Sequence, residues 1–512
     1  MAYTETFVDS TGQTHTLKPR FHRQARMRYR AENLEELFAD DFKLLKQYIN
    51  HHQTVQRPRI QELLDYAEGN NHTILESERR KDQDMADTRA VHNFGEYIAT
   101  FKQGYLVGNP IQVSYDDSDN ESVVEFLDEI SKDNSFHQLN RSLVLDLSKT
   151  GRAYDLVYRT QEDETKAVKL DPTATFVIYD MTKEENSLVG VRYYDKNQFS
   201  NNQKIIEVYT PDEILIIDSS KDFKVVDRTP HFFGTVPLTE YLNSSNGMGD
   251  YESVLSLIDL YDASQSDTAN YMQDLSDAIL AIIGRVSFPS DCDTAEKQIE
   301  FMRKMRKARL LNLEPPVDAN GNEGSVDAKY LYKQYDVNGT EAYKKRVIDD
   351  IHKITNTPDL SDDNFSGTQS GEAMKWKIFG FDQKRVDMQA LFEKSLKRRY
   401  KLIARISETL KEIQNFDLSK VRVTFVPNLP ADASNVVTNA KSLYGVVSDE
   451  TVYSMLQSAT GVDAKTEMER IEKQQQNSSL LSIQLEKNSR LSDKDLNEED
   501  ENNGERVLEE ED

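Results

Sequence analysis

The sequence predicts an α+β protein, mainly α-helical and built from more than one domain. Apolar residues recur at helical spacing over most of the chain, but between Arg152 and Leu242 they alternate with a period of two, which indicates strands. The length of 512 residues exceeds what one ordinary hydrophobic core holds. A block of strands inside a helical chain is typical of α+β architecture.

The first part of the chain is expected to be mainly helical. An amphipathic helix is predicted over Asn33–Asn50, with acidic residues on the face opposite its apolar residues. A second helix is predicted over Asp82–Phe101. It is followed by two short strands around a Gly-Asn-Pro turn within Tyr105–Tyr115. Helical pattern then returns and continues to about Thr150.

The segment of period two holds the strand candidates, which turn-prone Asp, Asn, Pro and Gly residues separate. The candidates are Tyr154–Tyr158, Phe176–Tyr179, Val189–Tyr194, Ile205–Tyr209 and Ile214–Ile217.

Long helices are predicted again in the second half. Apolar spacing over Asp250–Ile283 indicates one long helix or two nearly continuous helices. Arg285–Tyr335 is irregular but contains a basic helix over Lys297–Arg309. A further helix is predicted over about Glu341–Ile354, with Asn338 as a candidate N-cap.

A proline then ends the helical pattern, because Pro358 lacks a backbone N–H and fixes φ. A loop to Gly371 follows, and Glu372–Ile413 reads as one very long helix with an expected kink at Gly380. A strand is predicted over Val421–Val426.

The end of the chain is expected to hold a small helical region and a tail. The helical region covers Ser434–Arg470, and polar residues dominate from Gln474 onwards. Leu491–Asp512 carries 11 acidic residues against two basic ones, a composition typical of disorder.

Composition restricts the partners and the compartment. The formal net charge is −26, whereas a protein that binds phosphates tightly is basic at least locally. Either nucleic acid is no partner, or DNA passes close by without binding tightly. No run approaches the ~18 apolar residues of a membrane span, and Met1–Arg20 lacks the apolar run of a signal peptide. With Cys292 as the single cysteine, cytoplasmic assembly is expected.

The sequence contains no motif for nucleotide or hydrolytic chemistry. G-x-x-x-x-G-K-[ST], G-x-S-x-G, H-E-x-x-H and G-x-G-x-x-G are all missing. The best carboxylate cluster is Asp359, Asp362 and Asp363, but a two-metal nuclease needs acids that converge from separate elements. These acids share one loop, so a solvated loop is the simpler interpretation. We interpret His51-His52 as a surface pair and Cys292 as a buried or half-buried small residue.

Two basic clusters stand out in this acidic chain. The helix at Lys297–Arg309 is either a solvated face or a docking surface for an acidic partner. The cluster between Lys394 and Arg405 lies opposite apolar residues, so we interpret it as the polar face of an amphipathic helix, turned to water or to an acidic neighbour.

Several segments in a fixed order carry a family resemblance. They include Arg89-Ala-Val-His-Asn-Phe-Gly-Glu-Tyr-Ile98, Gly104-Tyr-Leu-Val-Gly-Asn-Pro-Ile111, Phe233-Gly-Thr-Val-Pro237 and Tyr251-Glu-Ser-Val254. The most specific segment is Thr357-Pro-Asp-Leu-Ser-Asp-Asp-Asn-Phe-Ser-Gly367, followed by Ser370-Gly371. From about Phe38 to Arg470 the sequence resembles the portal proteins of tailed bacteriophages, in the SPP1-type portal family.

The resemblance implies the portal fold, assembled as a ring of twelve subunits at one capsid vertex, through which double-stranded DNA is packaged and ejected. It also implies an order of parts. These are an N-terminal arm (1–32), a wing (33–250), a helix leading into the stem (251–284), a clip (285–335), a stem helix (336–356), a tunnel loop (357–371), a long kinked helix with a wing strand (372–430), a crown (431–475) and an acidic tail (476–512).

The tunnel loop is expected to line the narrowest part of the channel. Pro358–Gly371 contains no Lys or Arg, which suits DNA that must slide, because each neutralised phosphate raises affinity. We expect weak, sequence-independent contact with the phosphate backbone. The residues expected to line the channel are Asp359, Leu360, Ser361, Asp362, Asp363, Asn364, Phe365, Ser366, Gly367, Thr368, Gln369 and Ser370.

The resemblance also gives the basic clip helix a role, which is to dock the terminase during packaging and a head-completion adaptor protein afterwards. Major capsid and scaffolding proteins are further expected partners, and no membrane, cofactor, metal or catalytic residue is implied. The residues expected to dock the partners are Arg303, Lys304, Arg306, Lys307 and Arg309.

Two alternatives to the portal remain at the level of sequence. One is another structural protein of the phage head, such as a capsid or minor head protein. The other is a metal-dependent nuclease that would use Asp359, Asp362 and Asp363.

Overall fold

The computed structural model describes residues 6–8, 14–16, 23–76, 86–116, 121–197, 199, 203–221, 223–274, 279–283, 285–308, 313–316, 321–331, 336–359, 378–428, 433–460, 462, 464 and 467–475. The chain divides into two compact units. The first contains residues 1–366 and 377–428, and the second contains residues 367–376 and 429–512.

A six-stranded sheet forms one layer of the first unit. Its strand order is β11-β10-β9-β8-β7-β3, and neighbouring strands are antiparallel except β3 and β7, which are parallel. The strands are β3 (Tyr29–Arg30), β7 (Thr175–Tyr179), β8 (Ser187–Asp195), β9 (Lys204–Tyr209), β10 (Glu213–Asp218) and β11 (Lys224–Pro230). The four strand candidates of this region are confirmed, whereas β11 was not predicted.

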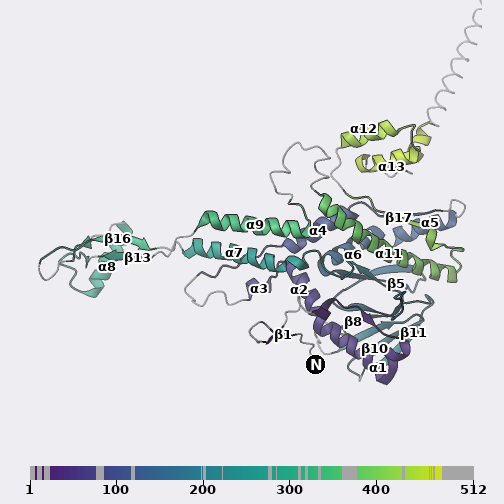
Figure 1. Cartoon of the computed structure of the whole chain (residues 1–512), viewed down its shortest axis with the longest axis horizontal. Coiled ribbons are helices and arrows are strands. Elements are labelled where there is room, and N and C mark those ends of the chain that lie inside the picture. The colour runs from purple at the N-terminus through teal and green to yellow at the C-terminus, as the bar shows by residue number, and fades with distance from the viewer. Residues whose placement is uncertain are drawn as a thin grey trace, which may run out of the picture. The chain divides into compact units, whose positions relative to one another are not determined.

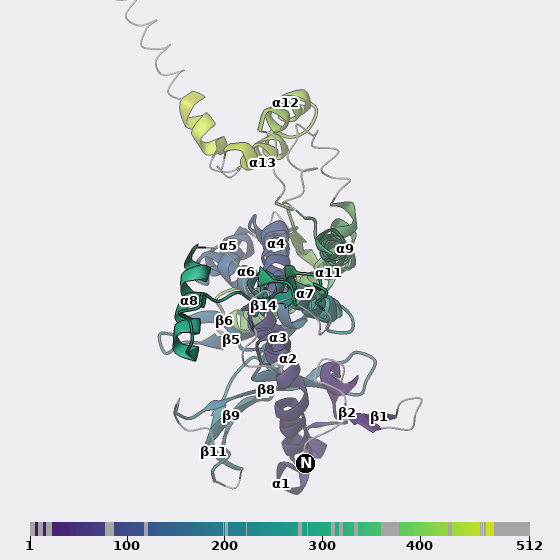
Figure 2. The same cartoon turned by 90° about the vertical axis from the view of Figure 1, so that its left-hand side faces the viewer.

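One face of this sheet is covered by α1 (Leu34–His51), which lies beside β8 in Figure 2. Leu37 and Leu45 of the helix are buried in one core with Phe176 and Val191 of the strands. Asn33 caps the helix, since its side chain accepts a hydrogen bond from the N–H of Glu36. A turn with positive φ at 40–42 interrupts the helix.

The two histidines at the end of α1 are buried, so the prediction of a surface pair was wrong. The hydroxyl of Tyr29 lies 2.8 Å from Nδ1 of His51, and the hydroxyl of Tyr193 lies 2.9 Å from Nδ1 of His52. These tyrosines supply the polar partners that a buried imidazole needs. Burial, assisted by nearby positive charge, lowers the pKa of His52 to about 3, so this imidazole is neutral.

A second, three-stranded antiparallel sheet has the order β12-β5-β6. Its strands are β5 (Arg152–Arg159), which confirms a predicted strand, and β6 (Thr165–Leu170) and β12 (Leu238–Leu242), which were not predicted. Helices α6 (Phe136–Thr150) and α11 (Phe379–Thr409) pack on it through a core that includes Leu147, Tyr241 and Phe392. The predicted strand near Val421 is β17 (Val421–Thr424), which pairs with β4 (Gln112–Tyr115).

The middle of α11 differs from the interpretation as a solvated basic face. Arg399 is fully buried, and its Nε lies 2.5 Å from Oδ2 of Asp155 on β5. Its guanidinium carbon also lies 5.0 Å from the ring centroid of Phe136. The neighbouring Arg398 donates hydrogen bonds to Ser187 and to the carbonyl of Val236. Helical spacing does not distinguish a solvated arginine from one that pairs with a buried carboxylate.

Helices α7 (Leu255–Asp274) and α9 (Val337–Thr355) lie side by side in Figure 1. Ile258 of α7 and Val347 and Ile351 of α9 share a core with α2 (Arg57–Ala67) and α4 (Phe94–Val107). Between α7 and α9 the chain forms α8 (Ala295–Ala308) and two strand pairs. These pairs are β13 (Ile279–Ile283) with β16 (Asp327–Leu331) and β14 (Arg285–Val286) with β15 (Leu313–Glu314).

Several helix boundaries differ from those predicted. The helix expected over Asp250–Ile283 ends at Asp274, and Ile279–Ile283 is a strand because it pairs with β16. Residues 86–93 are extended rather than helical, and 105–107 belong to α4 rather than to a strand. Helix α9 begins earlier than expected, with Asp336 as its N-cap. Gly380 lies in the first turn of α11, and the positions just before Ile378 are outside the described residues.

The remaining elements are short or belong to the second unit. The first unit also contains β1 (Thr6–Val8), β2 (Thr14–Thr16), α3 (His72–Leu75) and α5 (Glu121–Asp133). The second unit contains α12 (Ala433–Leu443) and α13 (Asp449–Thr460), within the region where the sequence predicted helices.

Candidate functional site at the start of α7

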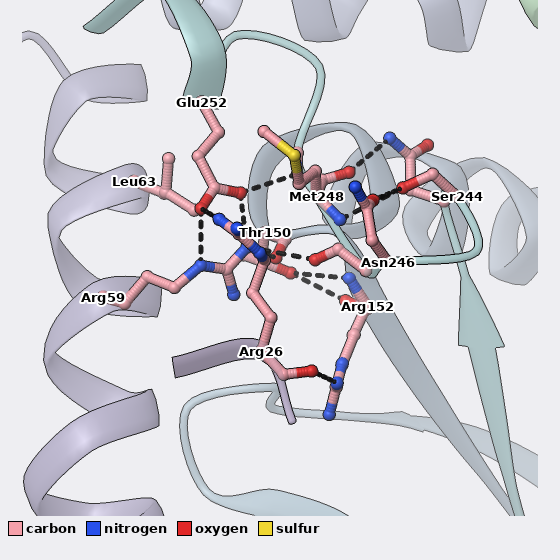
Figure 3. Close-up of polar contacts among 12 residues, drawn as sticks. Arg26, Arg59, Leu63, Thr150, Arg152, Ser244, Asn246, Met248 and Glu252 are labelled. Carbon is pink, nitrogen blue, oxygen red and sulfur yellow. Dashed lines mark hydrogen bonds and ion pairs between the residues drawn. The ribbon is translucent and has the colours of Figure 1, made fainter. Parts of the chain in front are cut away.

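A buried ion pair holds the chain immediately before α7. Arg59 of α2 and Glu252 have almost no exposed side-chain surface. Nε of Arg59 donates to Oε1 of Glu252 at 2.7 Å, and Nη2 donates to Oε2, so the contact is bidentate. Arg26 donates to the same Oε1 at 2.9 Å. Figure 3 shows the carboxylate of Glu252 facing both guanidinium groups.

The same guanidinium also binds backbone carbonyl groups. Nη2 of Arg59 donates to the carbonyl oxygens of Thr150 at 3.2 Å and Gly247 at 3.0 Å. The end of α6, the loop after β12 and the start of α7 therefore meet at one side chain (Figure 3). A helix end leaves carbonyl groups without partners inside the helix, and arginine is well suited to donate hydrogen bonds to several of them.

A glycine makes this close approach possible. Gly151 ends α6 with a φ of +84°, and a Cβ at this position would lie 2.2 Å from the carbonyl oxygen of Gly247. Both the positive φ and the lack of room for a Cβ thus require glycine at position 151. Arg152, the next residue, donates from Nη2 to the carbonyl of Arg26, which fixes the N-terminal segment against β5.

A second buried carboxylate lies two residues before Glu252. Asp250 forms ion pairs with Lys102 of α4 at 2.8 Å and with Lys384 of α11 at 3.0 Å. Ser148 of α6 donates to Asp250 at 2.6 Å, and the amide of Asn243 donates to it at 3.2 Å. Asp250 and Glu252 therefore connect the start of α7 to α2, α4, α6 and α11.

Both carboxylates are ionised in the folded protein. Burial alone would raise the pKa of Asp250, but the charges of Lys102 and Lys384 outweigh it and hold this pKa well below the ordinary value. Burial also opposes ionisation of Glu252, and the hydrogen bonds and charge of Arg59 hold its pKa below the ordinary value. Each carboxylate thus stabilises the fold above its unfolded-state pKa, and this contribution is lost as the pH falls through its folded-state pKa.

An extended segment runs along α7 and is held by buried polar side chains. Oδ1 of Asp262 accepts from the N–H of His92 at 3.0 Å, and Oγ of Ser266 accepts from the N–H of Ala90 at 2.9 Å. Farther along, Oδ1 of Asn270 accepts from the N–H of Thr88. Four residues of a helix rise about 6 Å, and two residues of an extended chain span about 6.6 Å. Every fourth residue of α7 therefore lies opposite every second residue of this segment.

The two ends of the segment between α9 and α11 lie close together. Asn356 ends α9 with a φ of +56°, and a Cβ on Gly380 would lie 3.2 Å from the side-chain oxygen of Asn356. The hydroxyl of Tyr97 on α4 donates to the carbonyl of Pro358 at 2.9 Å. The segment from 360 to 377 therefore begins and ends at the same place, next to α4.

The structure describes only part of the residues that the sequence singled out. Of the expected channel-lining residues, Asp359 is described, and the others, from Leu360 to Ser370, lie outside the described residues. Of the five clip residues, Arg303, Lys304 and Lys307 are exposed on α8, and the side chain of Arg306 and the whole of Arg309 are not described. Cys292 is a half-buried free thiol, as expected.

The described residues contain neither a metal-ligand cluster nor a membrane-spanning helix. No group of three or more His, Cys, Asp or Glu side chains among them is arranged to hold a metal ion. None of the described helices has both the length and the apolar character of a membrane span.

Sequence reasoning missed Arg59, Asp250 and Glu252. Charged residues are rarely buried unless they are paired, so a single sequence favours a surface position for each of them. One signal was present, since Tyr251-Glu-Ser-Val254 is one of the segments that carry the resemblance. A charged residue inside a family segment rich in apolar residues indicates a constrained position.

We predict that Arg59→Met destabilises the protein by about 3–5 kcal/mol, because it leaves the carboxylate of Glu252 buried without its main partner. Adding Glu252→Gln to Arg59→Met should recover part of the lost free energy of unfolding, since the effects of the two substitutions on stability are coupled. Urea unfolding followed by circular dichroism measures both.

Lys353→Met on the exposed surface of α9 is the matched control and should stay within about 0.5 kcal/mol of the parent. The difference in unfolding free energy between Arg59→Met and the parent should narrow as the pH falls, because burial without Arg59 raises the pKa of Glu252, so the variant takes up a proton while Glu252 of the parent is still ionised. If Arg59→Met lowers the free energy of unfolding no more than Lys353→Met does, this account of the ion pair is contradicted.

Comparison with known proteins identifies the family. The family described as phage portal protein, SPP1 Gp6-like, matches residues 46–479. The portal protein of Clostridium phage phiCD119 is similar, with 23% identity over 385 residues, which cover 71% of this chain and 80% of that protein. Because the family match spans most of the chain, this protein belongs to the SPP1 Gp6-like family of phage portal proteins.

Proposed function

We propose that this chain is a structural subunit of a ring of twelve copies, which forms the DNA channel at one vertex of a phage capsid. The observation that carries the proposal is the family match over residues 46–479. The described fold supports it, because α7 and α9 form a helix pair joined to the α+β part through Asp250 and Glu252. The expected location is the virion, after assembly in the host cytoplasm, and no catalysis is assigned to the chain.

The purified full-length protein tests the ring. We expect a particle with a central hole in negative-stain electron micrographs and a mass near twelve times 58.9 kDa by light scattering. A protein that stays monomeric over a wide concentration range, or that forms a sheet or a closed shell, would refute the portal assignment and favour another head protein.

The segment between α9 and α11 is proposed as the tunnel loop. The described residues on its two sides support this, because Asn356 and Gly380 lie next to each other. Pro358–Gly371 carries no positive charge, and a ring would repeat every side chain in the channel. Weak contact with phosphates follows from the missing cations.

We predict that Asp362→Lys makes the retention of double-stranded DNA by the ring salt-dependent. The slope of log affinity against log salt should steepen by about 1 for each phosphate that a lysine contacts. Asp362→Asn, which removes the negative charge without adding a positive one, is the control and should change the slope far less. If both variants behave like the parent, the loop does not lie next to DNA.

The basic face of α8 is proposed as the surface that docks the terminase and then the head-completion adaptor. Three of its cations are exposed, and the ion pair of Lys304 with Glu300 lies within the same helix, so it leaves this face accessible. An acidic protein with a localised basic helix offers acidic partners one favourable surface.

Replacing the five clip cations by Gln should abolish packaging or adaptor attachment while rings still form. The readouts are packaged DNA protected from nuclease and rings counted in micrographs. The matched control neutralises five exposed cations of the six-stranded-sheet region and should package normally. Loss of rings in the clip variant would instead indicate a contact between subunits. The clip set is Arg303, Lys304, Arg306, Lys307 and Arg309, and the control set is Lys183, Lys196, Lys221, Lys224 and Arg228.

A further inference from the structure

The helices of the second unit leave an apolar groove open between them. The groove has a volume of about 310 Å³ and is lined by Ala440 of α12, by Tyr444 directly after this helix, and by Val452, Tyr453 and Leu456 of α13. Tyr444 is 60% exposed, and the adjacent Val446 is 75% exposed. Exposed apolar surface at one place commonly marks a contact that another segment or molecule completes.

The helix pair buries little apolar surface in the part of it that the structure describes. Its helices have 11 and 12 residues, and Ala440 and Val452 are the only apolar side chains buried in the described part of the second unit. Helical units of this size need additional apolar burial to fold, because two short helices enclose little core. Covering the groove would therefore stabilise the helix pair.

We propose that the chain's own segment Leu480–Leu485 covers this groove. Leu480, Leu481, Ile483 and Leu485 form an apolar cluster in the otherwise polar sequence that follows Gln474. The family match ends at residue 479, so this cluster lies just beyond the matched residues. The inference does not rest on the ring, because the groove and the segment belong to the same copy.

The chain passes close enough to the groove for this contact. The described helical residues 467–475 begin beside Tyr453, whose pKa is raised by partial burial and by the neighbouring Tyr444, Asp449 and Glu467. Four residues lie between Gln475 and Leu480, and the five residue-to-residue steps span up to about 17 Å when extended.

Charge favours the same arrangement. Lys441 lies at the edge of the groove, and the sequence beyond the apolar cluster is strongly acidic, with 11 acidic residues against two basic ones in 491–512. The acidic sequence can approach Lys441 while the apolar cluster occupies the groove. Its attraction to Lys441 raises the local concentration of the apolar cluster near the groove.

Disulfide trapping in the full-length protein tests the proposal. In a Cys292→Ser background, Tyr444→Cys and Leu481→Cys introduce the only two thiols. Mild oxidation should form an intrachain disulfide, seen as a linked peptide in mass spectrometry with the protein migrating as a single chain. A ladder of linked chains would show that a second copy covers the groove, and no linkage at all would show that the segment lies elsewhere. Either result would overturn the proposal.

Two further variants of the trapping pair act as controls. Ending the chain after Arg490 removes most of the acidic tail but keeps the apolar cluster, so the disulfide should still form. Adding Leu480→Ser and Ile483→Ser should lower the yield of the intrachain disulfide at least about tenfold, because two apolar side chains lose their burial. An unchanged yield would mean that chance proximity, rather than docking, forms the bond.

Discussion

Two carboxylates, Asp250 and Glu252, enter the protein interior two residues apart, directly before α7. Removing a charge from water costs several kcal/mol, so each carboxylate must meet a cation in good geometry or the fold is lost. Arg59 satisfies Glu252 with two parallel hydrogen bonds, and Lys102 with Lys384 satisfies Asp250. Because the cations come from α2, α4 and α11, the two carboxylates restrict how these helices can lie relative to the start of α7.

The ion pairs of Asp250 and Glu252 fix the start of α7 more strictly than apolar packing does. Apolar contacts such as those of Ile258 with α9 contribute about 1.5–3 kcal/mol per buried side chain, yet they tolerate small shifts because they have no direction. An ion pair with bidentate geometry does not tolerate them. Helix α7 is therefore positioned by charge at its start and by the extended segment 86–92 along its side. Helix α9 is held mainly by apolar contacts and by Tyr97 at Pro358.

The sequence alone predicted the elements that turn one face to solvent, because polar and apolar residues then recur with a regular period. Strands such as β8 and helices such as α1 were found because their apolar residues alternate with polar ones. Elements that depend on a distant partner were missed or misassigned. Ile279–Ile283 is a short apolar run that fits either a helix or a strand, and it becomes a strand because β16 pairs with it. Polar residues at buried positions caused the other errors, as with His52, whose partner Tyr193 is 141 residues away.

A polar stripe on α7 is a further pattern whose position in the fold depends on a distant partner. Asp262, Ser266 and Asn270 are polar residues at helical spacing, and such a stripe usually faces water. Here all three are buried, since each accepts a backbone N–H from 88–92 that would otherwise have no partner. The stripe resembles a solvent-exposed helix face because its partner is the backbone of another segment. Backbone groups leave no pattern of residue types in the sequence. A polar stripe on a long helix is therefore compatible with burial wherever an extended segment of matching repeat can lie against it.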